Sequence, residues 1–569
     1  MNARTAAQRP DIRTYCCRPW IRRATVRHTS GAIDAAAPRT TPEEIAMALR
    51  LADGTASSDV LDRAVAAAPE AFAAPIDGVH TLHNLIEGDW RAVGVPAAVR
   101  TPIDNTILVR LPRLDAATAH AAVVHAATEH REWARTPLAD RKARVTAALD
   151  ALTAHRDLLA LLLVWEIGKP WRLAGADVDR ALDGVRWYVD EIDRMLADGR
   201  EPLPGPVSNI ASWNYPMSVL VHAELVQLLA GNAVIAKTPS QGGAVCLTVA
   251  HALMRRAGLP ATLVSGSGEE LSEVLVRAPE VGAVAFVGGR SNGGKVAAAL
   301  LDTDKRHFIE QEGLNAWGIW NFSRWDQLAG HLKKGFEYGK QRCTAYPRFV
   351  VQRNLVDQFL DVYLPVVRSV RFGHPLAVEH DRAASDPLPE LDFGPLISAA
   401  KAGELRRKVD EAVRGGAVPL YRGRLDGAPF LDGQDTSAYV APSVLLAPPG
   451  RSRLMHAEPF GPVDTIVVVD TADELLAAMN ASNGSLVASL ACDDEEEAEK
   501  LAVDVQAFKV GINKPRSRGD RQEPFGGRGA SWKGAFVGGD LLVQAVTVGG
   551  ADDRLYGNFP DWTALPPNV

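Results

Sequence analysis

The chain has 569 residues, of which 47% are hydrophobic and 23% are charged. This length predicts two or three domains, and this composition is ordinary for a globular protein with a large core. A formal net charge of -7 argues against nucleic acid as the main partner. The longest apolar run, from Leu158 to Trp165, is shorter than the ~18–20 residues that cross a bilayer, so no membrane partner is expected.

The cysteines are few and odd in number, and their spacing fits neither a disulfide framework nor a metal site. They are Cys16, Cys17, Cys246, Cys343 and Cys492. A reducing, cytoplasmic location is the simplest expectation, and it would keep a catalytic thiol in its usable form. No metal is expected.

The first 28 residues are basic, with seven arginines and a single acid, Asp11. They lack the apolar stretch of a secretory signal. A transit peptide is one interpretation, and a disordered arm or a mis-assigned start codon is the preferred one. Residues 41–74 are rich in alanine and predict one or two helices. Residues 1–80 are therefore expected to form an N-terminal extension that is partly disordered or helical.

An organised α/β domain is expected from about Leu82. Helical periodicity runs over 111–133 and 138–166, and Gly168 followed by Pro170 marks the end of the second helix. Beyond residue 204, short apolar runs alternate with helical patterns, which predicts right-handed βαβ units on a parallel sheet. The expected strands are 207–210, 233–236, 261–264 and 281–287, and the expected helices are 219–229 and 244–257.

A second α/β block is expected from Trp317 to Asn513. The acidic run 493–497 favours the start of a helix, where negative charge meets the positive end of the helix dipole. Residues 541–548 alternate weakly and predict a late strand.

Cys343 is the candidate nucleophile. A lone cysteine is more often a small buried hydrophobe, but Gly339 favours a turn here and the charge on Arg342 favours the reactive thiolate. Thiolate attack on an aldehyde creates an oxyanion, which the side-chain amide of Asn214 and the N–H of Cys343 could stabilise. An asparagine before Tyr215 and Pro216 is equally typical of a plain turn.

Water must then cleave the thioester, and this step requires a base such as a carboxylate. Glu310 follows the apolar pair Phe308 and Ile309 and fits the end of a strand. Glu312 lies two residues further along, so spacing alone leaves both acids open. Either one could also be an ordinary loop acid.

Removal of hydride requires an acceptor. Lys237 follows an expected strand and could bond a ribose or phosphate, although most lysines at strand ends are surface charges. Gly288 and Gly289 lie between a strand at 283–287 and a helix expected at 295–301, where a helix N-terminus would favour phosphate. The segment 266–268 lacks the rest of the dinucleotide fingerprint and carries little weight.

The chain resembles the aldehyde dehydrogenase superfamily from about residue 82 to residue 548, through seven motifs in the family's order. These are Ser212–Pro216, Gly231–Lys237, Phe286–Gly289, Glu310–Gly313, Gln341–Thr344, Glu458–Pro462 and Pro524–Gly527. The resemblance implies oxidation of a small aldehyde to a carboxylic acid through a cysteine thioester, with NAD or NADP accepting the hydride. It assigns Cys343 as nucleophile, Asn214 as oxyanion donor and Glu310, not Glu312, as base.

The resemblance also implies which residues bind the cofactor. Lys237 would bind the adenosine ribose, Glu458 the nicotinamide ribose, and the turn at Gly288 and Gly289 the pyrophosphate. The other residues expected at the cofactor are Ser212, Trp213, Ser240 and Phe460. Ser240 stands where NAD-preferring members usually carry a glutamate, which favours the use of NADP.

Other departures concern the base and the substrate. Glu312 replaces the first glycine of its motif, where a second carboxylate would repel the charge of Glu310 or crowd the site. Gly289 replaces a serine that usually touches phosphate. His222 falls where many members place an aromatic residue of the substrate tunnel; this would favour a polar or acidic aldehyde, and a core histidine explains it equally well. The remaining tunnel candidates are Arg342 and Thr344.

The expected fold class is α/β, with two Rossmann-like doubly wound domains and a small β oligomerisation element. The cofactor-binding domain is expected at 81–187 and 204–312 and the catalytic domain at 313–515. Residues 188–203 and 536–569 would form the oligomerisation element and C-terminal tail of a homodimer or homotetramer.

Two alternatives to this function remain open. A coenzyme A-acylating enzyme or a reductase is disfavoured by the presence of Glu310, because acylating members typically lack the base. A catalytically silent scaffold is disfavoured because all five main site residues are present together. These are Asn214, Lys237, Glu310, Cys343 and Glu458.

Overall fold

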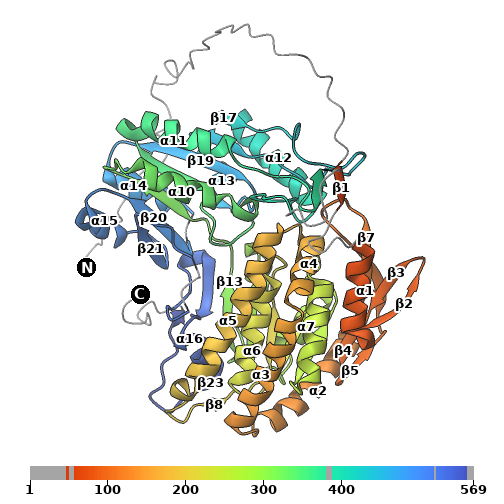
Figure 1. Ribbon diagram of the computed structural model, residues 1–569. Helices are drawn as coiled ribbons and strands as arrows, with labels where there is room; N and C mark the ends of the chain where they lie inside the picture. The colour runs from red at the N-terminus through yellow and green to blue at the C-terminus, as the bar shows by residue number, and fades with distance from the viewer. Residues whose placement is uncertain (1–46, 50–56, 380–387, 483, 518–520, 560–569) are drawn as a thin grey trace.

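The computed structural model describes residues 47–49, 57–379, 388–482, 484–517 and 521–559 (Figure 1). The basic first 28 residues lie outside these ranges. Strand β1 (Met47–Leu49) pairs antiparallel with β16 (Ala377–Glu379). Among the described helices, none combines the length and the apolar character needed to cross a membrane.

A nine-stranded sheet organises the first domain. Its five central strands are parallel because helices connect them, and they run in the spatial order β13 (Arg306–Glu310), β12 (Ala283–Val287), β9 (Val207–Ile210), β10 (Val234–Lys237), β11 (Ala261–Val264). Antiparallel strands close both edges. They are β4 (Asn84–Ile86) and β5 (Asp89–Arg91) beside β11, and β22 (Trp532–Ala535) and β24 (Gly557–Asn558) beside β13.

Helices cover both faces of this sheet, so most residues of its central strands are buried. One face carries α3 (Leu138–Ala154), α4 (Arg156–Ile167), α5 (Trp171–Met195), α6 (His222–Leu229) and α7 (Ala244–Arg256) (Figure 1). The other face carries α2 (Ala116–Trp133), α8 (Gly268–Ser272) and α9 (Arg290–Ala299), with a π-helical turn at η5 (Glu273–Arg277) after α8. A second π-helical turn, η4 (Pro216–Val221), lies on the first face, directly before α6.

Two of the expected helices have different bounds. Strand β7 (Ile107–Arg113) occupies the start of the expected helix at 111–133, and the side chain of Asp115 caps α2 instead. The expected helix at 138–166 is broken into α3 and α4 at His155. Gly168 ends α4 in a left-handed conformation (φ 66°), as predicted.

The chain is organised well before residue 82. A helix lies within 41–74, where one or two helices were expected, but the strands that precede residue 82 were not predicted. Helix α1 (Ser57–Ala67) buries Val60 and Ala64 in the main core. After the short η3 (Pro69–Ala71), a four-stranded sheet follows, in the order β2 (Phe72–Ile76), β3 (Val79–Leu82), β7, β6 (Val95–Arg100).

A seven-stranded sheet organises the second domain, which lies above the first in Figure 1. Its order is β17 (Val418–Arg422), β18 (Ser443–Leu446), β19 (Val463–Val469), β15 (Arg348–Gln352), β14 (Ala316–Ile319), β20 (Val487–Ala491), β21 (Lys509–Ile512), and only the edge strand β17 is antiparallel. Its main helices are α10 (Trp325–Gly335), α11 (Val356–Arg368), α12 (Ala399–Arg414), α13 (Arg453–His456), α14 (Ala472–Met479) and α15 (Glu495–Ala502). Two doubly wound α/β domains are therefore confirmed.

The segments expected to form the oligomerisation element differ most from prediction. Residues 188–195 continue helix α5, and only β8 (Glu201–Pro202) is a strand. The expected late strand at 541–548 is helix α16 (Asp540–Ala545) followed by the two-residue β23 (Thr547–Val548), which pairs with β8. The described part of this element is thus a two-stranded ribbon two residues long.

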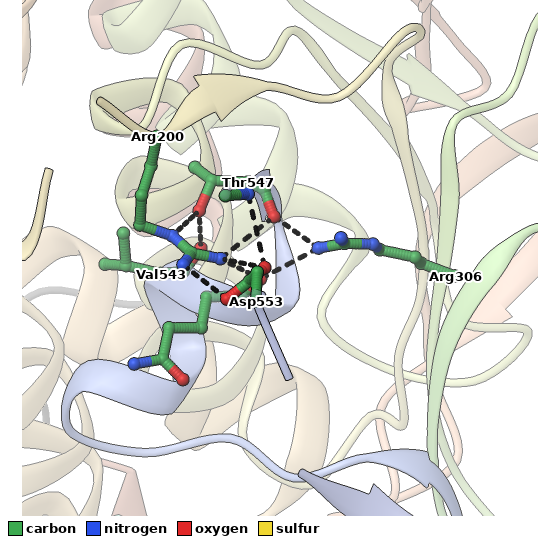
Figure 2. Close-up of polar contacts among 7 residues, drawn as sticks. Arg200, Arg306, Val543, Thr547 and Asp553 are labelled. Atoms are coloured by element: carbon green, nitrogen blue, oxygen red, sulfur yellow. Dashed lines mark hydrogen bonds and ion pairs between the residues drawn. The ribbon is translucent and has the colours of Figure 1, made fainter. Parts of the chain in front are cut away.

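A polar network ties this ribbon to the first sheet (Figure 2). Arg200 forms an ion pair with Asp553 (2.7 Å) and donates to Oγ1 of Thr547 (2.8 Å). Arg306, the first residue of β13, donates to the carbonyl of Gln544 (2.9 Å) and to that of Thr547. The C-terminal segment is therefore fastened to the strand whose other end is Glu310.

Candidate active site

The carboxyl ends of the central strands bring together residues from separate motifs. Lys237 ends β10 and Glu310 ends β13, both as predicted. The N–H of Gly288, just beyond β12, donates to the carbonyl of Glu310 (3.1 Å). Crevices at the carboxyl ends of parallel strands are where doubly wound sheets bind their ligands.

The candidate nucleophile and base are in direct contact. The Cys343 Sγ donates to Oε1 of Glu310 across 2.8 Å. Cys343 is half-buried and belongs to the second domain, whereas Glu310 is buried and belongs to the first. The contact therefore places a thiol and a carboxylate at the junction of the two domains.

The backbone before Cys343 is held in an unusual conformation. Tyr338, Gly339 and Lys340 all have left-handed φ angles, of 58°, 58° and 59°. Such angles cost free energy for residues other than glycine and persist where the surroundings enforce them. Here a buried ion pair between Lys340 and Asp464 (2.7 Å) contributes, and Lys340 also donates to the carbonyl of Tyr346 (3.0 Å).

The amide of Asn214 lies beside the nucleophile segment. Its Nδ2 donates to the carbonyl of Gln341 (3.0 Å), two residues before the cysteine. Buried Lys169 fixes the backbone here, since its Nζ donates to the carbonyl of Asn214 (2.8 Å) and pairs with Asp177 (3.1 Å). Sequence reasoning treated Lys169 only as part of a helix end, because its partners are distant in the chain.

Two more residues that position Cys343 were missed. A Cβ on Gly313 would lie 2.0 Å from the carbonyl oxygen of Cys343, so only glycine fits there. The Asn315 amide donates to the carbonyls of Cys343 (2.8 Å) and Ala345 (2.7 Å), while its oxygen accepts from the Ser485 hydroxyl (2.8 Å). Gly313 belongs to a recognised motif, whereas Asn315 carries no signal in a single sequence.

Glu312 points away from the base, toward the expected phosphate site. Its Oε1 accepts from the N–H of Arg290 (3.2 Å), the first residue of α9, and its Oε2 from the N–H of Glu458 (3.4 Å). The Glu312 carboxylate thus lies at the N-terminus of α9, where the sequence predicts that phosphate binds. The backbone carbonyl of Glu312 accepts from the hydroxyl of Ser531 (2.7 Å), which fixes the backbone.

Two buried polar groups fit a dinucleotide. Burial raises the pKa of Glu458 well above its usual range, as do the negative charges of Glu312 and Glu310, and within the described chain its Oε1 is buried without a partner. Burial lowers the pKa of Lys237 to about 8, with a smaller effect from Arg113. The Lys237 ammonium donates to the carbonyl of Thr238 (3.1 Å), which leaves capacity for ligand oxygens.

The remaining residues expected at the cofactor differ in burial and in their contacts. The rings of Trp213 and Phe460 meet edge to face (5.8 Å between centroids), and Phe460 is left-handed (φ 49°). Gly289 caps the N-terminus of α9, Ser212 is half-buried, and Ser240 is exposed three residues beyond Lys237.

A cavity of about 770 Å³ leads to Cys343 and has the size of a small-molecule site. Its lining includes the three tunnel candidates, His222, Arg342 and Thr344. The ring of His222 packs edge-on against Tyr188 (5.7 Å), and a Cβ on Gly184 would lie 2.7 Å from it. Helix α5 therefore forms one wall of the cavity.

Comparison with known proteins agrees with this geometry. The family model for the aldehyde dehydrogenase family matches residues 91–548. The NADP-dependent glyceraldehyde-3-phosphate dehydrogenase of Apium graveolens is 25% identical over 487 residues, which cover 81% of this chain and 92% of the relative. The NADP/NAD-dependent aldehyde dehydrogenase PuuC of Escherichia coli is 27% identical over 477 residues, covering 79% and 91%.

A solved structure agrees as well. NADP-dependent glyceraldehyde-3-phosphate dehydrogenase from Bacillus halodurans C-125, complexed with NADP, superposes with a TM-score of 0.73 at 25% identity, covering 82% of this chain and 97% of that chain. The family model spans most of the chain, and this protein therefore belongs to the aldehyde dehydrogenase family and is an NAD(P)-dependent aldehyde dehydrogenase.

Proposed function

We propose that the enzyme oxidises its aldehyde through a covalent thioester on Cys343, with Glu310 as base and Asn214 as oxyanion donor. The contact of 2.8 Å between Sγ of Cys343 and Oε1 of Glu310 carries this proposal. It provides a nucleophile and a proton acceptor in one place, as covalent catalysis requires.

In the first step, the Glu310 carboxylate takes the thiol proton and the thiolate attacks the aldehyde carbon. A carbon–sulfur bond forms, and the carbonyl electron pair moves onto oxygen. The amide of Asn214 and the N–H of Cys343 stabilise this oxyanion; donors of this kind are each worth roughly 10²–10³ in rate.

The cofactor is expected to lie against the first domain, with Lys237 at one ribose, Glu458 at the other and the Gly288–Gly289 turn at the pyrophosphate. The Lys237 ammonium has N–H donors that are not used by its one hydrogen bond, to Thr238. The Oε1 of Glu458 is buried without a partner among the described residues. Both groups therefore fit ribose hydroxyls. When bound there, NAD(P)+ supplies an acceptor for the hydride that leaves the substrate carbon.

In the last step, Glu310 returns to its carboxylate form by releasing the first proton to solvent and then takes a proton from water. The resulting hydroxide attacks the thioester carbon, the carbon–sulfur bond breaks, and the carboxylic acid leaves. Cys343 is regenerated as the thiolate. This route uses no coenzyme A, and the acylating alternative is not favoured.

Intact-mass spectrometry during turnover tests the roles of both residues. Cys343→Ser should remove acyl-enzyme and lower kcat by at least about 10³-fold. At a pH high enough to ionise the thiol without a base, Glu310→Gln should accumulate acyl-enzyme, because only hydrolysis then still needs Glu310. Asn214→Ala should lower kcat about 10²-fold with little change in folding. Full activity in Cys343→Ala would remove the mechanism.

We further propose that NADP is accepted well. Ser240 is exposed near the expected adenosine ribose, and no carboxylate stands at that position to repel a 2′-phosphate. Comparison of kcat/KM with NADP and NAD tests this, and a strong preference for NAD would contradict it. Introducing Ser240→Glu should then lower kcat/KM for NADP selectively, by roughly tenfold or more.

We also propose a homodimer or homotetramer in the cytoplasm. None of the three described cysteines forms a disulfide with another described residue, which is consistent with a reducing compartment. The two-residue pairing of β8 with β23 leaves open edges on this ribbon, and open edges favour pairing with another chain. Light scattering coupled to size-exclusion chromatography measures the mass directly, and a monomer at micromolar concentration would contradict the proposal.

A further inference from the structure

The cavity that leads to Cys343 has a surplus of positive charge. Seven lysine or arginine residues line its described walls, against three carboxylates. Each of these carboxylates already has a cationic partner. The pairs are Asp177 with Lys169 (3.1 Å), Glu337 with Arg172 (2.8 Å) and Glu523 with Lys509 (2.6 Å). The acids of the cavity are therefore compensated. Three of the seven cations also have acidic partners, whereas the other four form no ion pair with a described residue; these four are Arg180, Lys334, Arg342 and Lys514.

Arg180 is the cation best placed to receive a ligand. It belongs to the face of α5 that lines the cavity, together with Leu173, Asp177 and Gly184 at helical spacing. Its side chain is exposed, and it forms no ion pair with any described residue. A guanidinium in this state offers a planar set of donors that matches a carboxylate or phosphate.

Arg342 supplies a second guanidinium, next to the nucleophile. Its Nη2 donates to the carbonyl of Gly335 (3.2 Å), but its Nε is buried without a partner in the described part of the molecule. A buried donor without an acceptor costs free energy, which a bound anion would recover.

Both guanidinium groups line the same cavity as the candidate nucleophile. Arg180, Tyr215, Arg342 and Cys343 are all among its lining residues. Burial raises the pKa of Tyr215 to about 12, so its phenol stays neutral and its hydroxyl adds no negative charge beside the two arginines.

We infer that the substrate is an anionic aldehyde, with a carboxylate or phosphate a few atoms from its carbonyl, and that Arg180 and Arg342 bind this anion. The inference rests on the proposed function, because it assumes that Cys343 attacks the carbonyl end. Charge-assisted hydrogen bonds to the anion would orient the substrate and fix the distance between its carbonyl carbon and the sulfur.

Matched pairs of substrates test the inference. Succinate semialdehyde is compared with butanal, and glyceraldehyde 3-phosphate with glyceraldehyde, each with saturating NAD and NADP. In at least one pair, kcat/KM should be at least about tenfold higher for the anionic member, which is the effect of one charged hydrogen bond. The pair that responds distinguishes a carboxylate from a phosphate. The ratio should fall as ionic strength rises.

Variants of one helix supply the control. Arg180→Met should lower the ratio of kcat/KM for anionic over neutral substrate by about tenfold through KM, and Arg180→Lys should retain only part of it, as a charge without the planar fork. Arg186→Met removes the same charge from the same helix outside the cavity lining, where it pairs with Asp183 (3.1 Å), and should leave the ratio unchanged.

Three results would overturn the inference. Equal or better kcat/KM for the neutral member of both pairs would refute it while leaving the thioester mechanism intact. A ratio unchanged by Arg180→Met would refute the role of Arg180. Failure to oxidise all four aldehydes, while a neutral aromatic or long-chain aldehyde is oxidised, would also refute the inference and leave the thioester mechanism intact. Full activity of Cys343→Ala would instead overturn the mechanism, and the substrate assignment with it.

Discussion

Replacing Glu312 should tighten binding of the cofactor. Its carboxylate accepts from the N–H of Arg290 (3.2 Å) and from that of Glu458 (3.4 Å), between the expected sites of the pyrophosphate and the nicotinamide ribose. An incoming pyrophosphate needs the same helix N-terminus, so Glu312 must move aside. The variants Glu312→Gly and Glu312→Gln are therefore expected to bind NAD(P) more strongly than the parent enzyme.

The two hydrogen bonds of the Glu312 carboxylate set the size of the expected change in cofactor affinity. Both are long and partly exposed, so each contributes about 0.5–1 kcal/mol, and displacing the side chain costs about 1–2 kcal/mol. Removing that cost lowers the cofactor Kd by roughly 5–30-fold. Glu312→Gln keeps an acceptor but loses the repulsion between carboxylate and phosphate, so comparing the two variants separates charge from occupancy.

Isothermal titration with NAD and NADP, without aldehyde, measures these constants directly. Glu132→Gln, an exposed acid on α2 remote from the site, is the matched control for loss of one negative charge. The difference between parent and Glu312→Gln should shrink at high salt, because part of it is electrostatic. Unchanged or weaker binding in both Glu312 variants would refute the reasoning and show that the side chain does not compete with the cofactor.

Three further predictions concern two residues that position Cys343 and the buried carboxyl group of Glu458. Gly313→Ala places a Cβ 2.0 Å from the carbonyl oxygen of Cys343, so it should lower the free energy of unfolding by about 1–3 kcal/mol and remove most of kcat. Gly294 has open space around it, so Gly294→Ala should change neither quantity much. Thermal unfolding and steady-state kinetics measure both. Asn315→Ala should lower kcat and the free energy of unfolding by about 1–3 kcal/mol in denaturant titrations, because buried carbonyls and N–H groups lose their partner; unchanged kcat would contradict its positioning role. The raised pKa of Glu458 means that the folded state holds this proton more tightly than the unfolded chain, so its contribution to stability is greatest at low pH and is lost as pH rises above the ordinary carboxyl pKa. Glu458→Gln should therefore reduce the fall in Tm between pH 5 and pH 8, and an unchanged fall would contradict this.

The sequence predicted the first domain well where local pattern and topology agree. Apolar strands followed by glycine or a polar residue placed Lys237 and Glu310 at strand ends, and both lie there. Prediction failed at 138–166, because an unbroken alanine- and leucine-rich pattern hides the turn at His155. It also failed at 541–548, where eight residues are too few to distinguish helix from strand by periodicity.

In the candidate site too, local motifs could be predicted from the sequence, whereas contacts between distant residues could not. Motifs named the candidate nucleophile, base and amide, but nothing local predicts that Lys169 donates to the carbonyl of Asn214. The direction in which the Glu312 side chain points could not be predicted either. The sequence pattern places Glu312 beside Glu310, but it does not show that the Glu312 carboxylate contacts the N–H of Arg290. Tertiary contacts decide both, and a single sequence does not contain them.

The fastening of the C-terminal segment to β13 has a consequence for biosynthesis. Strand β13 pairs with β22, which the ribosome makes only after the whole second sheet, and Arg306 takes its partners from residues later still. Until then, the nascent first domain exposes an open strand edge, and such edges invite aggregation. The end of β13 that carries Glu310 therefore reaches its final surroundings only after residues 532–544 have been made, so chaperone demand during translation should exceed that of a protein whose domains close one after the other.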